Sequence, residues 1–206
     1  MSLTLYSMPS SGNSYKVRLL LALMGREYTH IGLENDSDAL TKAHSDGLLP
    51  LGKLPVLELA NGTQIPESNA ILCYLADGTD WLPDDNLDRA RVLGWMFFEQ
   101  NRHETVIAVR AALREYASRA HLATPERMAS LLAEGHAVLK IMDEHLSERD
   151  WLVGGSPTVA DVSLYAYTHT ADSRGGFDMT QFPAINAWVE RMSKLPGYVR
   201  LNGIPQ

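Results

Sequence analysis

Short apolar runs separated by turn residues are the main pattern of the first 78 residues. Four of these runs have the length and residue types of strands, at 3–6, 27–33, 54–59 and 63–66. The last two are joined by Asn61-Gly62, the preferred pair for a tight turn between antiparallel strands. We therefore predict two early strands followed by a β-hairpin.

Apolar residues at intervals of three or four predict helices between and after these strands. The stretch 13–24 has an apolar face and is followed by Gly25, which suits the left-handed backbone just beyond a helix. The stretch 67–77 has a similar face and stops at Gly78, and the polar stretch 36–46 is weakly helical. This order of elements favours a mixed sheet covered by helices.

Beyond residue 78 the pattern changes, because residues 79–86 have the composition of a linker and only helical spacing follows. Helices are predicted over 87–118, from Thr124-Pro125 to about residue 146, over 156–169 and from Pro183. Thr158 is followed three residues later by Asp161, a relative of the capping box at a helix start. The predicted domains are an α/β domain at 1–78, a linker at 79–86 and an all-α domain at 87–206.

Composition narrows the function classes. The 206 residues have a net charge of −7, which disfavours nucleic acid as a partner because phosphate binding needs a basic surface. The single cysteine, Cys73, excludes an internal disulfide and a zinc site of the cysteine type. No apolar run approaches the length of a membrane span, and no leader is evident after Met1. We expect a soluble, cytoplasmic protein with no metal and no membrane partner.

Polar side chains gather where helices are predicted to begin. Ser10, Ser11, Asn13 and Ser14 lie between the first strand and the first helix, and Glu67-Ser68 opens the helix at 67–77. A helix N-terminus has unpaired N–H groups and a partial positive charge, so it attracts anions. Serine and asparagine are also favoured helix caps, so capping is the alternative at each place.

Three segments together, PSSGNSYKVRLLLAL, GKLPVLEL and ESNAILCYLA, resemble the cytosolic glutathione transferases. The resemblance covers the first 78 residues without large gaps, and PTVADVSLY in the second domain is similar to the capping motif of the same family. It implies a thioredoxin-like N-terminal domain, an all-helical C-terminal domain and a homodimer. It also implies glutathione as co-substrate, with no other cofactor.

The resemblance assigns glutathione contacts to particular residues. Leu54, before a cis Pro55, is expected to offer its backbone N–H and C=O to the cysteinyl part of glutathione. Glu67 and Ser68 are expected to hold the γ-glutamyl end, and Lys53 to lie near the glycyl carboxylate. Leu54 would thus bind the peptide by a short antiparallel pairing.

The same resemblance places the group that stabilises the thiolate at Ser11, with Asn13 beside it. Ser10 is one residue away from that position, and Ser14 is expected to cap the helix. Many relatives have a cysteine near 13 or 14, and its absence here argues against a mixed-disulfide redox role. Tyr6, which another subset of the family uses, is expected in the core.

The remaining candidates lie in the helical domain. Gln100, His103 and Arg110 are candidates for a second-substrate pocket or a subunit cleft, with an ordinary polar helix face as the alternative. Cys73 and the cluster of Trp95, Phe97 and Phe98 are expected in the core. The predicted function is glutathione transfer to a small electrophile. The alternatives are a non-catalytic binder of glutathione or apolar ligands, acting as an interaction module, and a glutathione-dependent disulfide or peroxide reductase.

Overall fold

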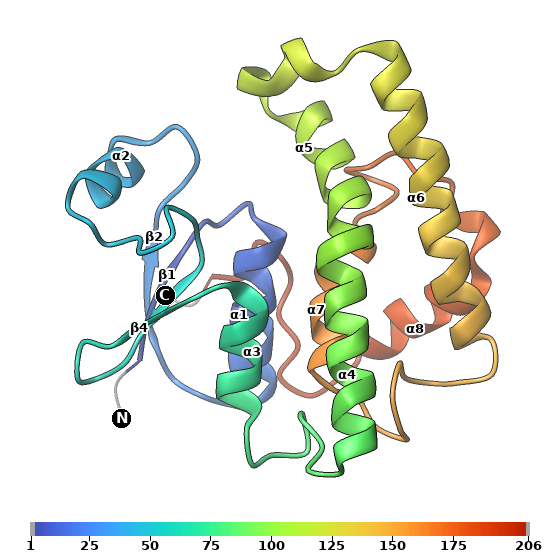
Figure 1. The fold of residues 1–206 in the computed structure, drawn as a ribbon, viewed down its shortest axis with the longest axis horizontal. Coiled ribbons are helices and arrows are strands. Elements are labelled where there is room, and N and C mark those ends of the chain that lie inside the picture. The colour runs from blue at the N-terminus through green and yellow to red at the C-terminus, as the bar shows by residue number, and fades with distance from the viewer. Residues whose placement is uncertain (1–2, 205–206) are drawn as a thin grey trace. The chain divides into compact units, whose positions relative to one another are not determined.

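The computed structural model describes residues 3–204, and these fall into two compact units. Unit 1 comprises residues 3–82 together with 195–204, and unit 2 comprises Pro83–Lys194. Unit 1 contains a sheet and helices and unit 2 contains helices only (Figure 1). The predicted architecture, a thioredoxin-like α/β domain followed by an all-α domain, is confirmed.

Unit 1 is built on a four-stranded mixed sheet. Its strands are β1 (Thr4–Ser7), β2 (Thr29–Gly32), β3 (Val56–Glu58) and β4 (Gln64–Pro66), in the order β2-β1-β3-β4. Strand β1 is parallel to β2 and antiparallel to β3, and β3 is antiparallel to β4. The predicted hairpin is therefore confirmed as β3 and β4.

The turn of this hairpin differs from the tight Asn-Gly turn that we predicted. A type I′ turn needs positive φ at both central residues, and in this turn only Gly62 has it, with φ of 81°. The loop is instead closed by hydrogen bonds from Leu59 N to Thr63 O and from Gly62 N to Leu59 O. Three residues thus lie between Leu59 and Thr63, and Gly62 provides the left-handed step.

Three helices complete unit 1: α1 (Gly12–Leu23), α2 (Asp38–Ser45) and α3 (Ser68–Ala76). Helices α1 and α3 lie side by side (Figure 1) and bury leucine and isoleucine side chains completely. Gly25 and Gly78 follow α1 and α3 with φ of 61° and 69°, so both predicted stops are confirmed. Tyr6 is 9% exposed in the core of this unit, as expected.

The last segment of the chain belongs to unit 1, although we predicted a helical domain that runs to residue 206. The Tyr15 hydroxyl donates to Val199 O at 2.7 Å, and Arg18 Nη2 donates to Leu201 O at 2.8 Å. Gly197 lies so close to Ala22 O that an added Cβ would be 2.6 Å from it. These contacts use backbone carbonyls, which every sequence offers, so the pattern of side chains does not reveal them.

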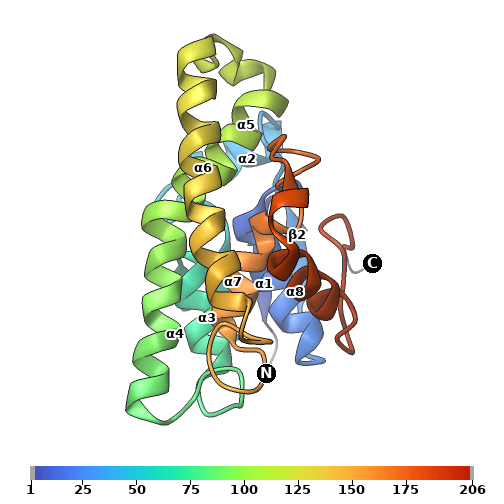
Figure 2. The same ribbon diagram turned by 90° about the vertical axis from the view of Figure 1, so that its right-hand side faces the viewer.

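Unit 2 consists of α4 (Asn86–Phe98), η1 (Glu99–Ala108), α5 (Val109–Glu115), η2 (Ala117–Leu122), α6 (Pro125–Leu146), α7 (Val159–Thr168), η3 (Met179–Gln181) and α8 (Pro183–Ser193). The predicted helix at 87–118 is interrupted by η1, which has π-helical hydrogen bonding. The long helix α6 contacts both η1 and α8 (Figure 2).

The predicted helix caps of unit 2 are confirmed. Thr124 Oγ1 accepts from Arg127 N at the start of α6, and Thr158 and Asp161 form the capping box of α7. Asp161 is completely buried and also accepts from Leu152 N and from Trp188 Nε1. Burial raises the pKa of Asp161, while these hydrogen bonds act in the opposite direction.

Cys73, Trp95, Phe97 and Phe98 were predicted in the core, and none of the four is fully buried: Trp95 and Phe98 are half-buried. Phe97 is 64% exposed, and Cys73 is half-buried on α3. Trp95 and Phe98 do contact each other, edge to face, at 5.2 Å between ring centroids. Between residues 3 and 204 no helix is long and apolar enough to cross a membrane. The same part of the chain has no group of three histidine, cysteine or carboxylate side chains that could hold a metal ion.

Candidate active site

The sheet topology of unit 1 brings three of the predicted site segments to one edge. Val56, the first residue of β3, pairs with Tyr6 near the end of β1 and with Pro66 at the end of β4. The residues after β1, before β3 and after β4 therefore meet at the same edge of the sheet. These are the segments that contain Ser11, Leu54-Pro55 and Glu67-Ser68.

Ser11 is the N-cap of α1. Its backbone is extended, with φ −83° and ψ 130°, and its Oγ accepts from Ser14 N at 3.5 Å. None of the residues described accepts a hydrogen bond from the Ser11 hydroxyl. Ser14 was expected to be the cap, and this is wrong, because α1 begins at Gly12 and Ser14 is already the third residue of the helix. Ser14 is buried and its Oγ accepts from Met8 N at 2.9 Å.

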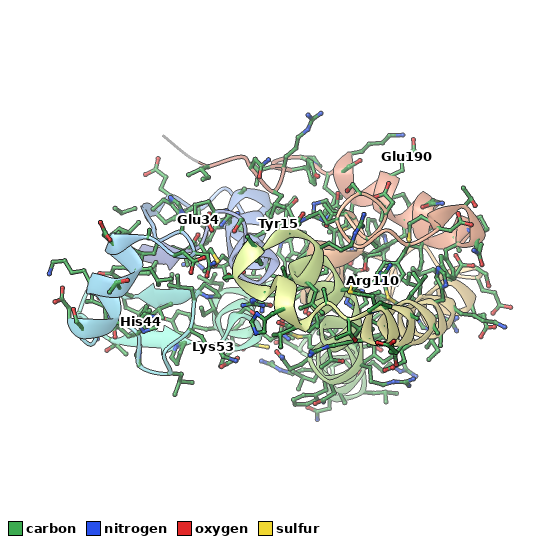
Figure 3. All side chains as sticks on the ribbon, turned by 90° about the horizontal axis from the view of Figure 1, so that it is seen from above. Tyr15, Glu34, His44, Lys53, Arg110 and Glu190 are labelled. Carbon is green, nitrogen blue, oxygen red and sulfur yellow. The ribbon has the colours of Figure 1, made fainter. Side chains whose placement is uncertain are left out.

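A carboxylate holds the loop before Ser11. Glu34 (Figure 3) accepts from Ser10 Oγ at 2.6 Å and from Ser10 N at 3.1 Å, and it also accepts from Asn35 N. Glu34 follows β2, and sequence reasoning missed it because no local motif marks it. The two bonds fix the residue that precedes Ser11.

Arg18 fixes the same loop from inside unit 1. Its guanidinium is fully buried and donates to Ser7 Oγ at 2.8 Å, to Met8 O at 3.3 Å and to Pro9 O at 2.9 Å. Burial lowers the pKa of Arg18, and nearby Glu34 acts against this shift. The only sequence signal for Arg18 is the basic start of the helix.

His30 completes this group. Its Nε2 lies 2.9 Å from Ser7 Oγ. Arg18 donates to the same oxygen, and the Ser7 hydroxyl retains its own proton and can donate it to Nε2 when the ring is neutral. Burial lowers the pKa of His30, and the nearby Arg18 charge lowers it further.

In the segment before β3, the backbone of Leu54 makes no hydrogen bond within residues 3–204. The Leu54–Pro55 bond is cis, as the resemblance implied. Pro55 is buried, and within residues 3–204 neither the N–H nor the C=O of Leu54 has a hydrogen-bond partner. Lys53 is exposed immediately before it (Figure 3). An extended peptide can add to such an open backbone unit by strand-type pairing.

The start of α3 lies against the start of α1. Ser68 is 5% exposed, and its hydroxyl donates to Asn13 Oδ1 at 3.2 Å. Glu67 precedes Ser68 with φ of 71° and ψ of 114°, a conformation that non-glycine residues rarely adopt and that is typical of binding sites. The exposed Glu67 carboxylate makes no capping bond to α3. Two helix N-termini and one exposed carboxylate therefore occur together at this edge.

Comparison with known families agrees with this geometry. The glutathione S-transferase N-terminal domain matches residues 1–77, and the glutathione S-transferase C-terminal domain matches residues 99–191. The chain belongs to the glutathione S-transferase family. The two matched regions lie within the regions predicted as α/β and all-α.

This family member is similar to proteins with several different names. It is 41% identical to a glutathione S-transferase from Xanthobacter autotrophicus Py2, with a TM-score of 0.88 and coverage of 97% of this chain and 96% of that one. It is 30% identical to a maleylacetoacetate isomerase of Rhizobium meliloti, over 95% of this chain and 93% of that protein. It is 25% identical to Ure2p, solved in complex with S-hexylglutathione, with a TM-score of 0.83 and 95% of each chain covered.

Curated relatives named Protein URE2 are longer than this family member. The chain spans 66% of the protein from Eremothecium gossypii and 58% of that from Kluyveromyces marxianus. The identities to these two proteins are 25% and 26%. The similarity therefore covers only part of the length of those relatives.

The three candidates in the helical unit of this glutathione S-transferase family member, Gln100, His103 and Arg110, have different surroundings. His103 is fully buried and its Nε2 lies 2.9 Å from Thr168 Oγ1, so we correct it to a core residue that presents no surface to a pocket. Arg110 donates to Gly175 O and to Met128 O, and thus joins three segments of unit 2. Gln100 is exposed and donates to Glu104.

Proposed function

We propose that this protein is a glutathione transferase that activates the thiol of glutathione for attack on a small, largely apolar electrophile. The observation that carries the proposal is the Ser11 hydroxyl at the N-terminus of α1, in the segment that meets the open backbone of Leu54 at one edge of the sheet. Its proton has no acceptor in the part of the chain that the structure describes, so it is available to a thiolate. Asn13 supports the same site.

The peptide part of glutathione fits the chemistry of the edge. The N–H and C=O of Leu54, before Pro55, take the cysteinyl unit in an antiparallel pairing. The Glu67 carboxylate binds the ammonium group of the γ-glutamyl end of glutathione. The carboxylate of that same γ-glutamyl end accepts hydrogen bonds at the N-terminus of α3, at Ser68. Exposed Lys53 takes the glycyl carboxylate. Glutathione is the co-substrate, and the proposal involves no other cofactor and no metal.

The energy required of Ser11 is modest. A free thiol has a pKa of about 8.5, so lowering it by about two units requires about 2.7 kcal/mol of preferential stabilisation of the thiolate. A hydrogen bond to a charged group contributes about 1.5–3 kcal/mol. A helix N-terminus such as that of α1 contributes up to about 2 kcal/mol more. These two effects suffice without a strong base.

The reaction then balances simply. The thiol proton leaves to solvent, and the thiolate sulfur forms a bond to the electrophilic carbon of the second substrate. With an aryl chloride, chloride leaves with the electron pair of the broken carbon–chlorine bond. The protein binds and orients the peptide and stabilises the anionic sulfur.

The proposal includes a homodimer. Leu51 is 58% exposed and Tyr74 on α3 is 48% exposed, and in the proposed dimer these apolar side chains pack against a second copy. A cytoplasmic location and a role in detoxification belong to the same proposal. A single cysteine, which cannot form an internal disulfide, fits a reducing compartment.

A second candidate is a non-catalytic binder of glutathione or of apolar glutathione derivatives. The similarity to Ure2p, which was solved with S-hexylglutathione, favours it among the alternatives. A disulfide or peroxide reductase is a third candidate. It is disfavoured because Cys73 is the only cysteine and lies on α3.

Activity with two substrate types separates these functions. The transferase is expected to conjugate chlorodinitrobenzene to glutathione, and glutathione is expected to raise the melting temperature. A rise in melting temperature without conjugation would favour the binder. Turnover of glutathione-mixed disulfides alone would favour the reductase, and no effect of glutathione on melting would contradict all three.

A further inference from the structure

Lys16 on α1 is buried to an extent that is unusual for a lysine. Its side chain is completely excluded from solvent, although lysine is almost never fully buried unless it is paired. It lies one turn after Asn13 on the same helix face. Its Nζ lies 3.5 Å from Ser68 Oγ, at the start of α3. The cation is therefore held between the two helix starts that form the proposed site.

A chain of hydrogen bonds leads from this ammonium to Asn13. An ammonium can only donate, so Ser68 Oγ is the acceptor for Lys16. The Ser68 hydroxyl in turn donates to Asn13 Oδ1 at 3.2 Å. This orientation turns the amide oxygen of Asn13 toward Ser68, so the other end of the amide is its NH2 group, a donor. A thiolate is stabilised by donors and not by a carbonyl oxygen.

We propose that Lys16 is a positioning residue for the glutathione thiolate, an inference that rests on the proposed function. Through Ser68 it orients the Asn13 amide as a donor, and it adds a positive charge beneath the starts of α1 and α3. Lys16 itself does not contact glutathione in this proposal.

The test is the pH dependence of the bound thiolate, followed by its ultraviolet absorbance in the full-length protein. We expect Lys16→Met, which keeps the length and apolar stem, to raise the apparent pKa of bound glutathione by about one unit, a tenfold loss of thiolate below that pKa. Lys16→Arg keeps the charge and the donors and is expected to restore most of the difference. The matched control Lys42→Met removes an exposed lysine of α2 and is expected to leave the thiol pKa unchanged.

The hydrogen-bonded chain adds a second, independent variant. Ser68→Ala keeps Lys16 but breaks the link to Asn13, so it is expected to raise the thiol pKa, and the double variant is expected to be non-additive. If Lys16→Met does not fold, an unchanged thiol pKa in Ser68→Ala still overturns the inference. If Lys16→Met folds and binds glutathione, an unchanged thiol pKa in that variant also overturns the inference. A wild-type protein without bound thiolate would instead overturn the proposed transferase function.

Discussion

Replacing Ser11 by alanine removes one hydroxyl that has two separate tasks. As the cap of α1 it accepts from Ser14 N, but at 3.5 Å this bond is at the long limit. Loss of the cap is therefore expected to reduce the free energy of unfolding by only about 0.5 kcal/mol. As the proposed donor to the thiolate it contributes about 1.5–3 kcal/mol, which corresponds to a loss of about 10- to 150-fold in kcat/KM.

The two tasks have different pH signatures. In Ser11→Ala the pKa of bound glutathione is expected to rise toward the free value of about 8.5, so the loss of activity is greatest near neutral pH. Above about pH 9 the free thiol is ionised in any case, and the two proteins are expected to converge. The assay is conjugation of chlorodinitrobenzene, with kcat/KM measured across this range. Ser11→Thr, which keeps the hydroxyl, is expected to keep most of the activity.

Ser37 provides a matched control, because it caps α2 in the same unit. Its Oγ accepts from Leu40 N at 3.1 Å and donates to Glu34 O at 2.7 Å. Ser37→Ala is therefore expected to reduce the free energy of unfolding by about 1–2 kcal/mol, more than Ser11→Ala, without changing the pH profile. An identical pH profile in wild type and Ser11→Ala would refute the role of Ser11. Equal losses of activity in Ser11→Ala and Ser37→Ala would reduce that role to capping.

Three further predictions concern stability and assembly. The pKa of His30 lies below its ordinary value of 6.5, so on acidification the unfolded chain binds a proton before the folded chain does. The free energy of unfolding, measured by urea titration, should therefore be highest above about pH 6.5 and should fall as the pH is lowered. His30→Gln should show a smaller fall over the same pH range. Asp161→Ala leaves the buried donors Leu152 N, Thr158 N and Trp188 Nε1 without their acceptor and should lower the free energy of unfolding by about 3–5 kcal/mol in urea titrations. A loss as small as that of exposed Asp178→Ala would contradict this account. Leu51→Asp places a charge on an exposed apolar side chain and should shift the protein toward monomer in sedimentation experiments, and an unchanged dimer would remove Leu51 from the interface.

Local patterns predicted most of the elements, because their causes are local. Helix α6 begins where Thr124 and Pro125 indicate, and α7 begins at the Thr158 capping box. The hairpin was found from its flanking apolar runs, but its turn type was wrong, because the Asn-Gly pair permits more than one loop geometry. The π-helical bonding of η1 was not foreseen, since it leaves no distinct spacing over so few turns.

The site was predicted less completely, because it depends on contacts between distant residues. Three short motifs at family-like spacing were enough to indicate Ser11, Leu54 and Ser68, but their functional roles remain predictions. The clamp of Glu34 on Ser10 and the burial of Lys16 arise from tertiary packing. His103 was misjudged for the same reason, since a polar residue on a predicted helix face can pair inside the core, as it does with Thr168.

The structure of the complex with glutathione tests the central proposal most directly. We predict that the sulfur lies within hydrogen-bonding distance of Ser11 Oγ, and that the N–H and C=O of Leu54, which lack a partner within residues 3–204, pair with the cysteinyl backbone. A glutathione sulfur bonded to another group, with Ser11 still serving only the Ser14 N–H, would contradict the account.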